Sequence, residues 1–177
     1  MSSILAIQHQ PYLPGVRIPH DFYQVLQEPA PRAGMAHPRQ VRPPWQDLHR
    51  LGLRHIICLA ESAPGYTPAP LKTLYAASLE DLFHGGPPQK PRMEARLLRE
   101  AVEVAASKLQ AGEGVVVHCQ GGTGRTGTVI GCLLRRLGFE SGEVLAYLND
   151  LNLARGKPGW PESEWQAQMV HSFLSEL

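Results

Sequence analysis

A chain of 177 residues, 43% of them hydrophobic, is long enough for one domain with an ordinary core. Its net charge of +1, with 19% charged residues, argues against binding nucleic acid or a membrane through bulk electrostatics. The cysteines Cys58, Cys119 and Cys132 are widely separated, which indicates neither a disulfide framework nor a zinc cluster, and no apolar run approaches the ~18 residues of a membrane span. We therefore expect a cytoplasmic monomer that needs no metal or cofactor.

Residues 1–44 contain eight of the sixteen prolines and show little sustained periodicity. Proline removes a backbone donor and fixes φ, so this stretch predicts an irregular lead-in that packs on the domain. One short strand is expected within it, at Ile4–Ile7. The domain itself is expected to occupy residues 45–177.

Helices and strands alternate beyond the lead-in. The alternation predicts an α/β fold, with a mostly parallel sheet of four or five strands and helices on both faces. A ligand would then bind at the carboxyl ends of the strands. The predicted helices are Pro44–Leu51, Arg92–Gln110, Thr126–Leu137, Ser141–Leu151 with Ser141 as its cap, and a last one that begins at Pro161 and Glu162; the predicted strands are Ile56–Leu59, Leu74–Ala77 and Val115–Val117.

Residues 78–91, SLEDLFHGGPPQKP, are dense in turn-forming residues and predict a loop. Two adjacent carboxylates, Glu80 and Asp81, lie in it. A carboxylic acid on a loop that closes over a substrate can transfer a proton to a leaving group. Neighbouring residues in an extended segment point in opposite directions, so we expect one of the two to do this.

An anion site is predicted where the strand Val115–Val117 stops at His118 and a glycine-rich loop leads into a helix. The first amides of a helix lack intrahelical partners and carry the positive end of its dipole, so they can converge on a phosphate. The residues expected to bind it are Gln120, Gly121, Gly122, Thr123, Gly124 and Arg125.

Three side chains indicate that this region is a reaction site as well as a binding site. Cys119 faces the loop amides, a setting that favours the reactive thiolate. Arg125 has a planar guanidinium that can bind two phosphate oxygens at once, which a lysine cannot do. Thr126 places a hydroxyl where it can stabilise the thiolate as a leaving group.

The run His118-Cys119, five residues, Arg125-Thr126-Gly127 resembles the signature of the protein tyrosine phosphatases, and the short chain resembles their dual-specificity branch. The resemblance covers about residues 45–173 and implies that Cys119 attacks phosphorus, that Arg125 binds the phosphoryl group, and that a phosphocysteine forms and is hydrolysed. By the same resemblance His118 and Thr126 are further catalytic residues. The resemblance also implies a general acid thirty to forty residues before the cysteine, an interval that favours Asp81 over Glu80.

The segment that begins PESEWQAQ is similar to the family as well, with a glutamate, a hydroxyl residue and then a glutamine. By that likeness Gln166 positions the hydrolytic water; Gln168 is an alternative, and a structural role is equally open. Cys58 is interpreted as a core residue, with a reversible disulfide to Cys119 as the other possibility.

Parts of the sequence are also compatible with other functions. Gly124-Arg125-Thr126 is similar to the end of a nucleotide-binding P-loop, but the first glycine of that motif would fall on Cys119 and its lysine on Arg125. A phosphatase of phosphoinositides, nucleotides or RNA, and a binding module without activity, are further alternatives. The loop has no lysine, which favours phosphotyrosine or phosphoserine/threonine on proteins as substrate.

Overall fold

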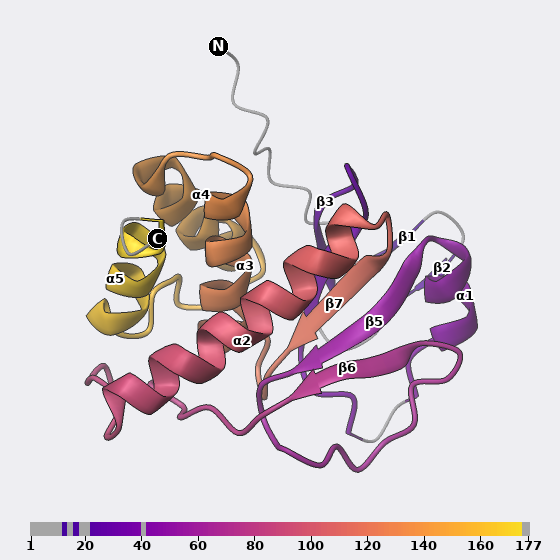
Figure 1. Cartoon of the computed structure of the whole chain (residues 1–177), viewed down its shortest axis with the longest axis horizontal. Coiled ribbons are helices and arrows are strands. Elements are labelled where there is room, and N and C mark those ends of the chain that lie inside the picture. Colours follow the sequence, from indigo (N-terminus) through magenta and orange to yellow (C-terminus); the bar gives the residue numbers. More distant parts are fainter. Residues whose placement is uncertain (1–11, 14–15, 18–21, 40–41, 175–177) are drawn as a thin grey trace.

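The computed structural model describes residues 12–13, 16–17, 22–39 and 42–174. Five strands form one sheet in the order β3-β4-β7-β5-β6 (Figure 1). All neighbours in it are parallel except β3 and β4, which are antiparallel. The bounds are β3 Tyr23–Leu26, β4 Arg32–Met35, β5 Leu53–Cys58, β6 Lys72–Ala76 and β7 Gly114–His118; β1 (Tyr12–Leu13) and β2 (Val16–Arg17) pair separately.

Helices cover both faces of the sheet, as predicted. α1 (Trp45–Arg50) packs its Trp45 and Leu48 with Ile56 and Val116 on one face. On the other face Val115, Val117 and Ile57 pack with the remaining helices. These are α2 Pro91–Gln110, α3 Gly124–Arg136, α4 Ser141–Ala154 and α5 Glu164–Ser172. A strand buried on both faces is apolar throughout, which explains the Val115–Val117 run in the central strand β7.

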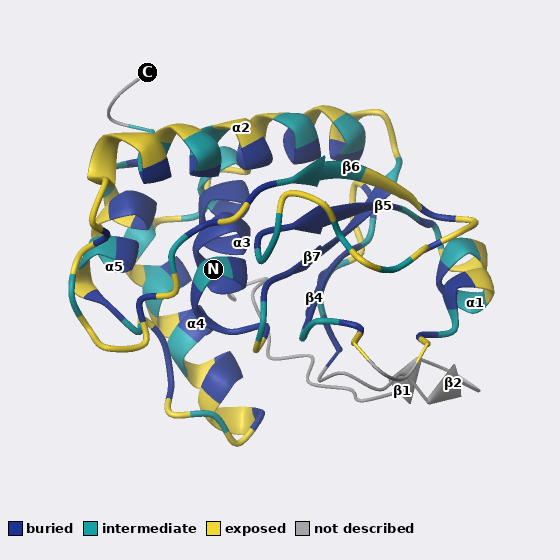
Figure 2. Cartoon of the chain, turned by 90° about the horizontal axis from the view of Figure 1, so that it is seen from below, coloured by how far each residue is buried: buried dark blue, intermediate teal, exposed yellow. Residues whose placement is uncertain are grey.

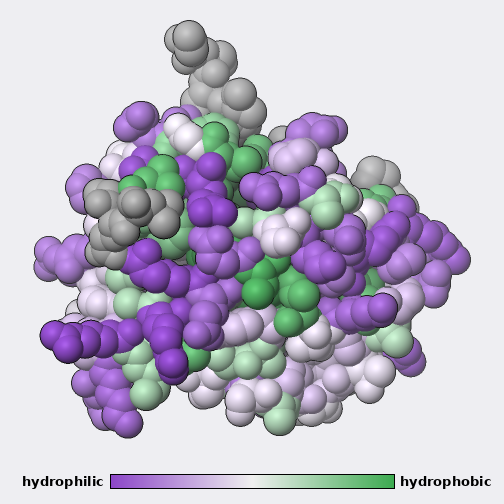
Figure 3. Space-filling model, viewed as in Figure 1, coloured by the Kyte–Doolittle hydropathy of each residue, from purple (hydrophilic) through white to green (hydrophobic). Residues whose placement is uncertain are grey.

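α3 is the central helix of this second layer. Apart from its three arginines, every residue of α3 is buried (Figure 2). α2 is instead amphipathic, and the face of the molecule in which it lies is mainly hydrophilic, with apolar residues in separate patches (Figure 3). Among the helices that the structure describes, none has the length and apolar character needed to cross a bilayer.

The prediction of an irregular lead-in is wrong for residues 23–35, because β3 and β4 belong to the main sheet and β4 lies directly beside β7. The sequence of β4, Arg-Ala-Gly-Met, has no strand-like pattern. Its Arg32 is nevertheless buried, since the guanidinium donates to the carbonyls of Glu28 (3.1 Å) and Ala30 (3.4 Å). The strand expected at Ile4–Ile7 lies outside the described residues.

Three predicted helix starts are also displaced. α3 begins at Gly124, two residues early, which puts Arg125 in its first turn. α4 is preceded by Glu140 in extended conformation, so Ser141 is already helical and lies 2.9 Å from His171 Nδ1 instead of capping. α5 begins at Glu164 and not near Pro161, because Ser163 is its N-cap and accepts a hydrogen bond from the Trp165 amide.

Candidate active site

The loop between β7 and α3, residues 119–125, is called the signature loop below. Gly122 in it has φ +74°, and a Cβ there would come within 2.6 Å of the Met35 backbone, so only glycine fits. The Gly122 carbonyl accepts hydrogen bonds from Tyr23 Oη (2.9 Å) and Arg155 Nη1 (3.2 Å). The Arg155 guanidinium also lies over the Tyr23 ring, 4.2 Å from its centre. The loop is therefore held from behind by buried groups.

The amides of the signature loop are free to bind a ligand. Across the residues that the structure describes, no group accepts a hydrogen bond from the amides of residues 120–126; the first that is engaged is Gly127 N, bonded to Thr123 O at 2.8 Å. No side chain caps the start of α3. Seven consecutive donors beside the positive end of a thirteen-residue helix form a site for an anion.

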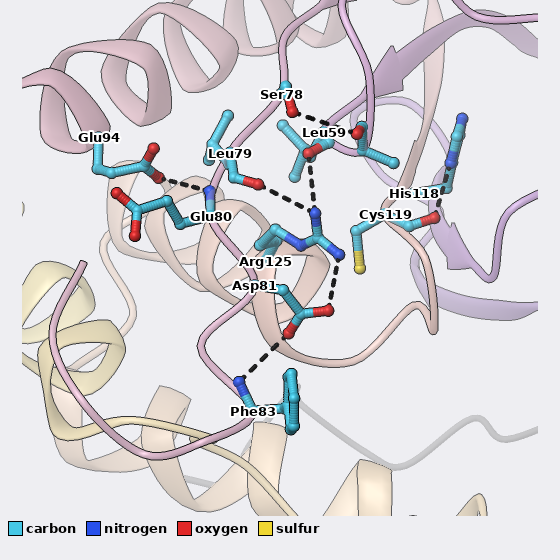
Figure 4. Close-up of polar contacts among 11 residues, drawn as sticks. Leu59, Ser78, Leu79, Glu80, Asp81, Phe83, Glu94, His118, Cys119 and Arg125 are labelled. Atoms are coloured by element: carbon cyan, nitrogen blue, oxygen red, sulfur yellow. Dashed lines mark hydrogen bonds and ion pairs between the residues drawn. The ribbon is translucent and has the colours of Figure 1, made fainter. Parts of the chain in front are cut away.

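Cys119 begins this loop and is 2% exposed. Its sulfur faces the space in front of Arg125 and Asp81 (Figure 4). The Thr126 hydroxyl is completely buried and has no hydrogen-bond partner in the described part of the chain. A buried hydroxyl without a partner is costly, which is consistent with a partner that is present only during reaction.

Arg125 joins the signature loop to residues 78–90, called the acidic loop. Its Nη1 donates to Leu79 O (3.0 Å) and to Leu59 O (3.4 Å), and its Nη2 donates to Asp81 Oδ2 (3.1 Å). Asp81 Oδ1 accepts from the Phe83 amide at 3.2 Å. The Asp81 side chain is 44% exposed, whereas that of Arg125 is 10% exposed. An incoming phosphate would compete with Asp81 for this guanidinium.

The neighbouring carboxylates on this loop are turned in different directions, as expected for adjacent residues. Glu80 accepts hydrogen bonds from the amides of Gln89 (2.9 Å) and Lys90 (3.2 Å) and thereby holds the end of the loop against the start of α2. Its own amide donates to the buried Glu94 carboxylate at 3.1 Å (Figure 4). Asp81 is thus the carboxylate beside Arg125, and its role as acid remains a prediction.

Gln166 lies at the signature loop and Gln168 does not. Gln166 is 1% exposed; its Oε1 accepts from the Glu162 amide at 2.9 Å, and its Nε2 is buried without a partner among the described residues. A Cβ on Gly124 would be 2.9 Å from that Nε2. Gln168 is exposed and contacts Glu164 on the outside of α5.

Glu162 is a site residue to which sequence reasoning assigned no role. A Cβ on Gly124 would be 1.8 Å from its Oε2, so the carboxylate is packed against the signature loop. Burial raises the pKa of Glu162, the negative charge of Asp81 raises it further, and Arg125 opposes the shift. The glutamate in the PESEWQ segment was the available signal, but spacing alone does not reveal which of its side chains reach the loop.

His118, expected among the catalytic residues, lies in a polar cluster behind Cys119 whose other members were missed. Burial lowers the pKa of His118 to about 4, so its ring is neutral at pH 7. In this neutral ring Nδ1–H donates to Cys119 O (3.1 Å), and Nε2 accepts a hydrogen bond from the Tyr66 hydroxyl. His37 stands edge-on to His118, is 2.6 Å from Glu61, and donates its amide to Gln120 O at 3.0 Å. His118 is the last residue of β7 and belongs to the signature, whereas the other members lie in separate loops that no motif connects to it.

The other two cysteines are buried. Cys58 pairs with His118 across β5 and β7, and its thiol lies 3.4 Å from Glu61 O; burial raises the pKa of that thiol. A disulfide with Cys119 stays a prediction. Burial likewise raises the pKa of Cys132 in the α3 core. Within the described residues, no three His, Cys, Asp or Glu side chains are grouped as metal ligands would be.

This geometry defines a phosphate-binding loop with a cysteine and an arginine in an α/β domain, and comparison with known proteins identifies its class. The model of the family described as the Swiss Army Knife protein dual-specificity phosphatase domain, PTP-SAK, matches residues 26–157, about three quarters of the chain. The chain belongs to that family. The match begins within the stretch predicted as a lead-in, in agreement with the place of β4 in the sheet.

Individual relatives are more distant. The tyrosine-protein phosphatase cdcA of Emericella nidulans is 27% identical over 163 residues, which are 89% of this chain and 26% of that protein. The chain therefore spans about a quarter of that relative's length. Kinase associated phosphatase has a TM-score of 0.61 at 20% identity, covering 84% of this chain and 88% of the other. PTPMT1 in complex with PI(5)P has a TM-score of 0.60 at 17% identity, covering 82% and 90%. At these identities the two structures show a shared fold.

Proposed function

We propose that this phosphatase-family domain hydrolyses phosphomonoesters on proteins through a phosphocysteine intermediate, without a metal. The observation that supports it best is the run of seven amides, residues 120–126, that bond to no described residue and lie beside the Cys119 sulfur and the Arg125 guanidinium. Together they offer donors on several sides of a phosphoryl group and a nucleophile beneath it.

In the first step the Cys119 thiolate attacks phosphorus. The S–P bond forms while the ester P–O bond breaks, and the loop amides with Arg125 bind the equatorial oxygens. Asp81 gives its proton to the leaving oxygen. In this step Arg125 Nη2 exchanges Asp81 for a phosphate oxygen. Because Asp81 Oδ2 lies 3.1 Å from Arg125 Nη2 before the exchange, the acid starts close to the phosphoryl group and its leaving oxygen.

In the second step water attacks the phosphocysteine. The new P–O bond replaces the S–P bond, the electron pair returns to the Cys119 sulfur, and the proton of the water passes to the Asp81 carboxylate. Gln166 Nε2, which has no other partner among the described residues, positions the water. The unpartnered Thr126 hydroxyl donates to the departing thiolate.

We assign Glu162 as the partner of Asp81 in proton transfer. The charges of Asp81 and Arg125 both act on its carboxylate, which lies against Gly124. Burial and the nearby negative charge of Asp81 raise the pKa of Glu162 and so favour the form of its carboxyl group that carries a proton. Glu162→Gln should therefore move the alkaline limb of the kcat–pH profile to lower pH, and an unmoved limb would remove Glu162 from this role.

Protein substrates are favoured by the absence of lysine from the signature loop and by the tyrosine-protein phosphatase cdcA among the relatives. The fold shared with PTPMT1, which was solved with PI(5)P, makes phosphoinositides the specific alternative. The loop chemistry would act on either.

The test is a turnover assay on phosphotyrosine, phosphoserine and phosphothreonine peptides, phosphoinositides, nucleotides and a small aryl phosphate. Release of phosphate from peptides that is abolished in Cys119→Ser, with a phosphoryl adduct on wild-type Cys119 after rapid quenching, is the expected result. Turnover by Cys119→Ser would overturn the mechanism. Turnover of phosphoinositides alone would overturn the protein substrate.

A further inference from the structure

A second hollow lies at the same edge of the sheet as the signature loop, on the side of α1. Its volume is about 330 Å³. Arg39 and Arg42, which follow β4, form one wall together with two prolines. Tyr66 and Thr67, which follow β5, form the other wall, and Trp45 at the start of α1 closes it.

The hollow is positively charged. Arg39 and Arg42 are exposed, and neither side chain has an ion-pair partner in the described part of the chain; no carboxylate lines the hollow. The acidic residues on the adjoining elements are already paired, Asp47 with Arg50 at 2.9 Å and Glu61 with His37 at 2.6 Å. Two unpaired guanidinium groups above a cavity select a carboxylate or a phosphate.

The inner surface of the hollow is aromatic and fixed. Trp45 is 3% exposed and its ring stacks on that of Tyr66, with centres 6.1 Å apart and planes inclined by 16°. Tyr66 is in turn held by its hydroxyl contact with His118. A rigid aromatic surface beneath charged groups suits an anion carried on a short side chain, because the stem packs on the rings while the charge reaches the arginines.

The hollow is joined to the signature loop at two points. Tyr66 contacts His118, which directly precedes Cys119, and the His37 amide donates to Gln120 O at 3.0 Å. Both sites lie at the carboxyl ends of neighbouring parallel strands, β4 and β5 for the hollow and β7 for the signature loop, and neighbouring strands are about 5 Å apart, so a few residues of extended peptide can reach from one site to the other. One substrate molecule can therefore occupy both.

We propose that this hollow is a second anion subsite, in which Arg39 and Arg42 bind an acidic side chain of the phosphopeptide whose phosphorylated residue enters the signature loop. The proposal rests on the proposed function and specifies its substrate as peptides with a carboxylate or a second phosphate near the scissile one. A peptide side chain fits a concave site with two cations, whereas a membrane surface calls for a broad basic face, which a chain with net charge +1 does not supply.

The experiment compares matched phosphotyrosine peptides in which a single Glu, Gln or phosphoserine is moved through positions two to four on either side. Arg39→Ala, Arg42→Ala and the double variant are tested against wild type. Arg96→Ala, an exposed arginine on α2, is the matched control. A small aryl phosphate, which cannot reach the hollow, reports the basal reaction.

We expect the wild type to prefer Glu or phosphoserine over Gln at one position, and the double variant to lose about tenfold in kcat/KM on those peptides, as for one charge-assisted hydrogen bond. Gln peptides and the aryl phosphate should be unaffected, as should Arg96→Ala throughout. No preference in the wild type, or an equal loss on the aryl phosphate, would overturn the subsite. The subsite would also be overturned if the arginine substitutions lowered activity only on phosphoinositide vesicles.

The two proposals fail separately. If peptides are hydrolysed but their acidic residues make no difference, the subsite is wrong and the proposed function stands. If the aryl phosphate is hydrolysed and no peptide is, the protein substrate itself is wrong, and the subsite with it.

Discussion

The signature loop and the acidic loop meet at Arg125 but are built in opposite ways. The signature loop is held from behind by buried groups, with Tyr23 and Arg155 on the Gly122 carbonyl and Trp160 on the Gly124 carbonyl. The acidic loop lies on the surface, and its most prominent side chain, Phe83, is 76% exposed. Leu79 and Leu82 anchor it in the domain, because both are buried and the Leu79 amide donates to Leu59 O at 3.1 Å, but Asp81 between them is exposed.

This difference matches two chemical tasks. Binding a phosphate needs amides that are already in place, because reorganising a polar site would consume the energy gained on binding. Proton transfer needs a carboxylate that approaches and withdraws as substrate and product exchange. We therefore expect substitutions that displace the signature loop to lower activity on all substrates. Substitutions in the acidic loop should lower activity to an extent that depends on the leaving group of the substrate.

The largest effect is expected for Asp81, the proposed general acid. Asp81→Asn should lower kcat by about 10²–10⁴-fold on substrates with poor leaving groups, the usual worth of a positioned general acid, and much less on an activated aryl phosphate. Glu80→Gln is the matched control and should lack this leaving-group dependence, since Glu80 faces the Gln89 and Lys90 amides and the oxygen of Gln can still accept one of these two hydrogen bonds. The reverse pattern would transfer the role to Glu80, and no dependence in either variant would place the acid elsewhere.

The next effect tests the rigid loop. Gly122→Ala requires an alanine at φ +74° with its Cβ against the Met35 backbone, at a cost of about 1–3 kcal/mol in the free energy of unfolding. The displaced amides should lower kcat/KM by about 10²-fold on all substrates alike. The matched control is Gly121→Ala, where no atom lies within 4 Å of the added Cβ. Urea unfolding and aryl phosphate kinetics measure both; equal behaviour of the two variants would contradict a loop held from behind.

A smaller effect is expected from Gln166, the residue proposed to position the water. Gln166→Ala should slow hydrolysis of the phosphocysteine by about tenfold, so that a burst of leaving group precedes slower steady-state release. Gln168→Ala, two residues away on the exposed side of α5, should behave as wild type. Stopped-flow measurement with an activated aryl phosphate separates the two steps. A loss in the burst rate instead would show that Gln166 acts on phosphoryl transfer to Cys119.

The sequence predicted the parts of the site that are contiguous in the chain. Cys119, the loop amides and Arg125 lie on one strand–loop–helix unit, and the α/β alternation correctly placed this unit in a parallel sheet with helices on both faces. β4 was missed because its burial depends on carbonyls that accept from Arg32 and on Gly34, whose missing side chain leaves room for the Tyr23 ring. Neither feature produces a periodic pattern in the sequence from which a strand could be predicted.

Residues contributed by separate loops were harder to predict. Glu162, Tyr66 and His37 reach the signature loop only through the path of the chain between elements. The choice between Glu80 and Asp81 likewise depends on the Gln89 and Lys90 amides, which bind the first carboxylate and leave the second beside Arg125. Family spacing favoured Asp81, but only the folded loop shows where Glu80 is held.

The smallest predicted effect concerns Glu94, the buried anchor of the acidic loop. Glu94 is 5% exposed and accepts the Glu80 amide, and burial raises its pKa above the ordinary carboxyl value. Between the ordinary and the raised pKa the folded protein binds more protons at this group than the unfolded chain does, so the contribution of Glu94 to stability falls as pH rises through that window.

Glu94→Gln keeps an oxygen for the Glu80 amide and removes the charge. The free energy of unfolding of this variant, relative to wild type, should therefore increase from pH 4 to pH 7, while kcat stays close to that of wild type. Urea unfolding at the two pH values measures the difference, with Glu164→Gln on the exposed face of α5 as the reference for removing a surface carboxylate. A relative stability that decreases with pH would mean that the Glu94 charge is stabilised where it lies, and a large fall in kcat would mean that the acidic loop depends on that charge and not only on the hydrogen bond.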